Sequence, residues 1–68
     1  MHSDRLIHMA NQIAAYFQAY PRDEAVAGIS EHLKLFWEPR MLVGIKHHVA
    51  QGGDGLHDLV PEAVRRLC

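Results

Sequence analysis

The sequence predicts an all-α protein: a small bundle of three main helices plus a short C-terminal helix, in a single domain over residues 1–68. Apolar residues recur at spacings of three and four along each segment, and no segment alternates apolar and polar residues over the length of a strand. Pro21, Pro39 and the glycine-rich run 52–55 divide the chain into helix-sized pieces. A chain this short buries only about 60% of its unfolded surface, so we expect a marginal core.

The first helix is expected over residues 4–20. Ser3 is a suitable N-cap, and the acidic Asp4 favours the positive start of a helix. The apolar stripe of this segment contains Leu6, Ala10, Ile13, Phe17 and Tyr20, flanked by Met9 and Tyr16. The opposite, polar side contains Asp4, His8, Asn11 and Gln18. Pro21 ends the helix, because the residue before a proline avoids the helical conformation.

The second helix is expected over residues 23–37. Its apolar stripe contains Val26, Ile29, Leu33, Phe36 and Trp37, with Ser30 inside it. Gly28 and Leu35 fall on the opposite side. The pair Glu38-Pro39 ends this helix, and a proline suits the first turn of the helix that follows.

The third helix is expected over residues 40–51, with an apolar stripe of Met41, Leu42, Ile45 and Val49. Gly52 is the natural residue to end it. The fourth helix, over residues 59–67, has Ala63, Val64 and Leu67 as apolar members. Two turns are not stable alone, so this helix must dock on the others. The short connections favour antiparallel neighbours, so we expect the first two helices to form a hairpin whose open side the last two close.

Composition excludes several classes of protein. Seven basic against eight acidic residues leave no basic stripe for nucleic acid or for an anionic membrane surface. Cys68 is the sole cysteine, so no disulfide forms within the chain, and we expect this residue to be accessible at the chain end. Neither a signal-peptide pattern nor an apolar run of membrane-spanning length is present. These features favour the reducing cytoplasm.

No set of residues predicts catalysis or metal binding. His47 and His48 are adjacent, so on a helix they point about 100° apart and cannot both ligate one ion. Zinc-site spacings such as His-Glu-x-x-His and Cys-x-x-Cys are absent. The run Gly52-Gly53-Asp54-Gly55 lacks the spacing of a phosphate-binding loop, and we interpret it as a helix C-cap followed by a tight turn. We therefore expect no catalytic, cofactor-binding or metal-binding residue in this chain.

The residues that remain predict a surface that binds a protein partner. Trp, Arg and Met are enriched where proteins bind each other, and all three occur between Leu35 and Met41. The candidate partner-binding residues are Leu35, Trp37, Pro39, Arg40 and Met41, together with Gly28 and Val43. Ile7 and Ala14 also fall outside the predicted core stripes, and several such apolar residues on a small protein indicate a partner surface. Trp37, at a stripe edge, fits the core, the interface or both.

Several motifs cover nearly the whole chain in order. They are MANQIAAYF (9–17) followed by Tyr20-Pro21, EAVAGISEHL (24–33), FWEPRM (36–41), GGDGL (52–56) and LVPEAVRRL (59–67). This ordered set resembles the small delta subunit of soluble, NAD-dependent, molybdenum-containing formate dehydrogenases. The resemblance implies a cytoplasmic complex that oxidises formate to carbon dioxide and reduces NAD.

The resemblance also implies where the cofactors lie. The alpha subunit carries a bis-molybdopterin guanine dinucleotide molybdenum centre and iron–sulfur clusters, while other subunits carry FMN, further clusters and the NAD site. The delta chain carries none and offers no catalytic residues. It is implied to bind and stabilise the alpha subunit, and through it to join the beta and gamma subunits. A transient assembly or cofactor-insertion factor for the same enzyme is the alternative. A helical DNA-binding module and a small metalloprotein are the remaining classes.

Overall fold

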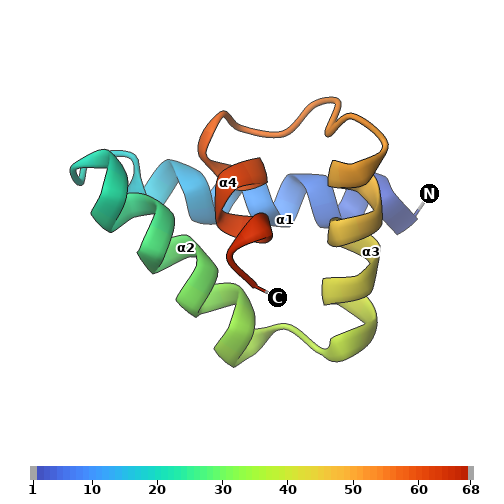
Figure 1. Cartoon of the computed structure of the whole chain (residues 1–68). Coiled ribbons are helices and arrows are strands. Elements are labelled where there is room, and N and C mark those ends of the chain that lie inside the picture. Colours follow the sequence, from blue (N-terminus) through green and yellow to red (C-terminus); the bar gives the residue numbers. More distant parts are fainter. Residues whose placement is uncertain (1, 68) are drawn as a thin grey trace.

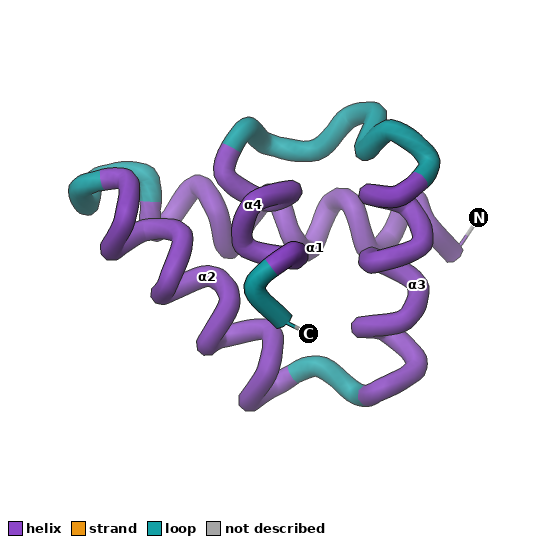
Figure 2. Tube along the Cα trace, viewed as in Figure 1, coloured by secondary structure: helices purple, strands orange, loops and turns teal. Residues whose placement is uncertain are grey.

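The computed structural model describes residues 2–67, and within this range it contains four helices and no strand. The helices are α1 (His2–Phe17), α2 (Arg22–Phe36), α3 (Pro39–Ala50) and α4 (Leu59–Arg65). Figure 2 shows that the helices are joined by short loops, except for the longer segment between α3 and α4. The predicted fold class, three main helices and a short C-terminal one, is confirmed.

The first helix lies across the back of the other three. In Figure 1, α2 and α3 diverge from their shared linker, and α4 lies between them. Helix α4 packs against α2, α3 and α1, while α1 also contacts both α2 and α3. The two-turn helix α4 therefore docks between its neighbours, which supplies the stability that so short a helix lacks alone.

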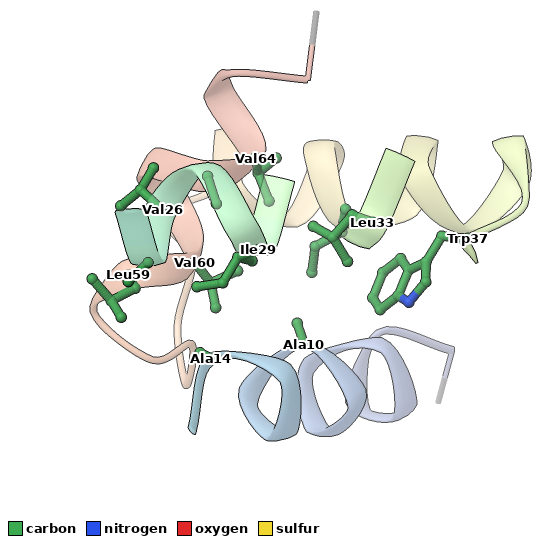
Figure 3. Packing of buried hydrophobic residues seen from close by; sticks show 12 residues of the cluster. Ala10, Ala14, Val26, Ile29, Leu33, Trp37, Leu59, Val60 and Val64 are labelled. Carbon is green, nitrogen blue, oxygen red and sulfur yellow. The ribbon is translucent and has the colours of Figure 1, made fainter. Parts of the chain in front are cut away.

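The core forms where α2, α4 and the middle of α1 meet. Figure 3 shows side chains of α2 and α4 directed toward α1, where Ala10 and Ala14 lie one helical turn apart. The fully buried large side chains are Ile29, Leu33, Ile45, Val26 and Val60. We expected Ala14 to lie outside the core stripe, and this prediction is wrong because α4 covers a second sector of α1 and buries Ala14 completely.

Helix α1 differs from its predicted bounds at both ends. It begins at His2, so Ser3 lies within the first turn rather than at the N-cap position. It ends at Phe17, and the backbone N–H of Tyr20 donates to the carbonyl of Phe17 in the turn that follows. Tyr20 is therefore 45% exposed instead of belonging to the core stripe. The expected exposure of Cys68 concerns a position outside the described residues.

The linker between α2 and α3 separates two adjacent aromatic residues that were both expected on the apolar stripe. Helix α2 ends at Phe36, and Trp37 adopts extended backbone angles (φ −91°, ψ 140°). Glu38 is also extended, as the residue before a proline should be, and Pro39 opens α3. Because Trp37 leaves the helical path, its indole turns into the core and is only 7% exposed, whereas Phe36 is 70% exposed. The prediction that Phe36 is a core residue is therefore wrong.

Glycines end α3 in the way the sequence predicts. The N–H of Gly53 donates to the carbonyl of His48 (2.9 Å), and the N–H of Gly52 donates to that of Val49 (3.1 Å). This pair of bonds is a Schellman motif, and Gly52 has the positive φ of 120° that favours glycine there. The N–H of Leu56 then donates to the carbonyl of Gly53, closing a tight turn. The interpretation as C-cap and turn is confirmed.

Asn11 ties the loop before α4 to the first helix. Its side-chain amide donates to the carbonyl of Gly55 (2.8 Å) and accepts from the backbone N–H of His57 (2.7 Å). The imidazole of His57 in turn accepts from the N–H of Leu59 (3.1 Å) at the start of α4 and bonds the side chain of Gln18 (3.3 Å). We predicted that Asn11 and Gln18 lie on the polar, outward side of the first helix. The loop before α4 instead docks on that side of α1.

An exposed cluster of charges also joins α2 to α4. Arg22 pairs with Asp58 (2.9 Å) and with Glu62 (3.0 Å), and Glu62 lies 3.7 Å from Arg66. Hydrogen bonds to Asp58 and then to Glu62 hold the pKa of Arg22 above its ordinary value. All four side chains are substantially exposed, so the cluster orients the two helices and adds little to stability.

Candidate partner-binding groove

The described part of the chain gathers no group of three histidine, cysteine or acidic side chains that could hold a metal ion. Among residues 2–67, no helix is both long and apolar enough to cross a bilayer. The prominent surface feature is instead a set of exposed large apolar side chains: Tyr16, Tyr20, Leu35, Phe36 and Val43.

A groove of about 780 Å³ runs between α1 and the end of α2. One wall comes from α1, and the other comes from the C-terminal turn of α2, the linker and the start of α3. Its lining residues are Met9, Gln12, Ile13, Tyr16, Phe17, His32, Phe36, Trp37, Glu38 and Met41. We refer to these ten residues as the groove.

Aromatic rings form the far end of the α1 wall. The rings of Tyr16 and Phe17 meet edge to face with their centres 5.0 Å apart, and the Tyr20 ring lies 5.8 Å from that of Phe17. A hydrogen bond with Tyr16 raises the pKa of the Tyr20 phenol above its ordinary value of 10.0. Tyr16 is 68% exposed, so most of its ring is available to a partner.

The opposite wall combines an exposed ring with a buried one. Phe36 lies against the imidazole of His32, one turn earlier on α2, with ring centres 4.8 Å apart. Trp37 closes the base of this wall, and Figure 3 shows its indole directed from the linker toward α1. Met41 is half-buried and adds a flexible side chain beside it.

The structure divides the predicted partner-binding residues among different places. Trp37 and Met41 line the groove, whereas Leu35 and Val43 are 65% and 66% exposed outside it. Pro39 and Arg40 are exposed next to the groove without lining it.

Gly28 does not belong to the free surface we predicted. It is half-buried, and a Cβ placed there would lie 2.5 Å from Cε1 of Phe17. The missing side chain lets the Phe17 ring of α1 pack directly on α2. Gly28 therefore positions one wall of the groove and is covered by it.

Sequence reasoning missed Tyr16, Phe36 and His32 as members of this surface. The adjacent pair Phe36-Trp37 carried a usable signal, because neighbouring residues at a helix end point in different directions and only one can enter the core. The i, i+4 pairing of His32 with Phe36 was a second signal.

One comparison with known proteins identifies a family. The family described as NADH-dependent formate dehydrogenase delta subunit, FdsD, matches residues 5–64. Searches of the curated proteins and of the solved structures gave no match. The family match covers α2 and α3 completely and most of α1 and α4, and it includes both walls of the groove. The chain therefore belongs to the delta-subunit family of NADH-dependent formate dehydrogenases.

Proposed function

We propose that this chain is a non-catalytic accessory subunit that binds and stabilises the alpha subunit of an NAD-dependent formate dehydrogenase. In this proposal the alpha subunit holds the bis-molybdopterin guanine dinucleotide molybdenum centre and iron–sulfur clusters, and other subunits hold FMN. The delta chain joins the beta and gamma subunits through alpha, in the cytoplasm. It contributes binding surface and no group to the oxidation of formate.

The observation that carries this proposal is the exposed groove on so small a protein. The core of so short a chain leaves little stability to spare, yet the chain keeps large aromatic side chains such as Tyr16 and Phe36 in water. Burying these rings against another protein would stabilise both partners, because a ligand that binds only the folded state raises its apparent stability. Family membership makes formate dehydrogenase subunits the natural partners.

Deletion of the chain tests the proposal. We expect the complex made without it to be obtained in lower yield, or to lose activity faster, while formate turnover per molybdenum atom stays unchanged. A collapse of the normalised rate in an otherwise intact enzyme would mean that the chain takes part in catalysis. Copurification of the chain with active enzyme at fixed stoichiometry would separate a permanent subunit from a transient assembly or cofactor-insertion factor.

A further inference from the structure

We propose that the groove receives an amphipathic α-helix of the alpha subunit, oriented by a basic residue that pairs with Glu38. This inference rests on the function proposed above and adds the site and the chemistry of what occupies it.

The composition of the walls favours a helix over an extended segment. Seven of the ten lining side chains are apolar or aromatic, and the polar ones are Gln12, His32 and Glu38. A strand laid in this groove would bury backbone N–H and C=O groups that find few partners. A helix satisfies those groups internally and presents only side chains, as in other complexes in which a helix lies in an apolar groove.

The length of the α1 wall sets the length of contact. The wall extends from Met9 to Phe17, which is about 12 Å of helix, or a little over two turns. A partner helix crossing this distance places two or three large apolar side chains in the groove at i, i+3 or i+4, and i+7. Met9 and Met41 lie half-buried on opposite walls, and their flexible side chains can adapt to the inserted side chains of the partner.

Charge at the linker end gives the partner helix a direction. Glu38 is exposed, makes no side-chain cap for α3, and forms no ion pair with any of residues 2–67. It lies at the junction of α2 and α3, where the negative end of one helix dipole meets the positive end of the next, so the carboxylate itself is the charge that a partner meets. The exposed carboxylate therefore favours a lysine or arginine of the partner at this end.

The indole of Trp37 adds a second polar requirement. Its N–H finds no acceptor within residues 2–67, although the side chain is only 7% exposed. Among the described residues no fully buried side-chain nitrogen lacks a partner, so this donor reaches the surface of the groove. An occupant that covers this donor has to replace water with an acceptor, either a polar side chain or a free carbonyl at a helix end.

Exposed residues allow a test that spares the fold. Phe36→Ala and Tyr16→Ala each remove a mostly exposed ring from one wall, and Glu38→Lys reverses the unpaired charge. His8→Ala is the matched control, because it also removes an exposed ring and His8 lies outside the groove. Each variant is coexpressed with the other subunits, its helicity is checked by circular dichroism, and its affinity for the purified alpha subunit is measured at two salt concentrations.

We expect each ring truncation to weaken binding roughly thirty-fold, as for an interface anchor, with His8→Ala close to the parent. Glu38→Lys should weaken binding most at low salt. A photo-crosslinker at position 12, which is Gln12 in the parent, should label one helical segment of alpha that carries a basic residue.

Three results would overturn the proposal that the groove binds a helix of the alpha subunit. The first is groove variants that bind the alpha subunit as tightly as the parent, which leaves the accessory function intact. The second is crosslinking to an irregular loop or to another subunit. The third is a dimeric isolated chain that Phe36→Ala makes monomeric, because the occupant is then a second copy. A parent chain that never binds alpha contradicts instead the proposed function itself.

Discussion

Two leucines on α2 provide a direct test of the packing. Leu33 is fully buried in the core, whereas Leu35, two residues later on the same helix, is 65% exposed. Leu→Ala at either position removes the same atoms and changes the helix propensity by the same small amount. The difference between the two variants therefore measures burial alone.

The expected cost of Leu33→Ala follows from its complete burial. Losing three buried carbon groups costs about 2.4 kcal/mol in transfer free energy, and the cavity left behind brings typical losses to about 3–5 kcal/mol. A domain of this size has about 3–10 kcal/mol of unfolding free energy in total. Leu33→Ala should therefore lower the Tm by at least about 12 °C and leave the isolated chain partly unfolded at 37 °C. Leu35→Ala should change the free energy of unfolding by less than about 0.5 kcal/mol.

Thermal melts followed by far-UV circular dichroism and by the fluorescence of the single tryptophan supply the measurement. Coincident transitions from the two probes would establish that unfolding is two-state. Equal Tm losses in the two variants would refute the assignment of faces to α2. A Leu33→Ala chain whose Tm lies within 2 °C of the parent's would also refute this assignment, because such a shift corresponds to a loss of well under about 1 kcal/mol.

Two further predictions concern polar contacts. Asn11→Ala removes both hydrogen bonds that fasten the loop before α4, so it should destabilise the chain by about 1–2 kcal/mol in urea denaturation. The control His8→Ala, at an exposed position of the same helix, should have little effect. Equal effects of the two variants would mean that the loop does not depend on Asn11. Tyr16→Phe removes the hydrogen bond that raises the pKa of Tyr20, so the remaining phenol should titrate closer to 10.0 in an absorbance titration. The pKa of the Tyr20 phenol is higher in the folded chain than in the unfolded chain, so this contact stabilises the fold below about pH 10. The stabilisation is lost as the pH rises through the folded pKa of Tyr20. A Tyr20 titration that Tyr16→Phe leaves unchanged would show that the two phenols do not interact.

The sequence by itself determined the number of helices, their class and, to within one residue, both ends of α2 and α3. Pro39 opens α3 and Gly52 follows its end because a proline lacks an N–H and a glycine tolerates a positive φ. Such causes act within a few residues of the chain, so they can be read without any knowledge of tertiary contacts. The order of motifs was likewise enough to indicate the family, which residues 5–64 match.

Only the tertiary structure decided which side of each helix is covered. Asn11 faces the loop because of bonds to residues 44 and 46 positions later, and no local pattern contains that information. Trp37 enters the core in place of Phe36 because the backbone leaves the helix one residue earlier than the apolar stripe suggests. A stripe counted along a helix assumes one partner and a regular backbone, whereas α1 has three neighbours and α2 ends in an extended linker. The groove exists because these two departures leave Tyr16 and Phe36 outside the core.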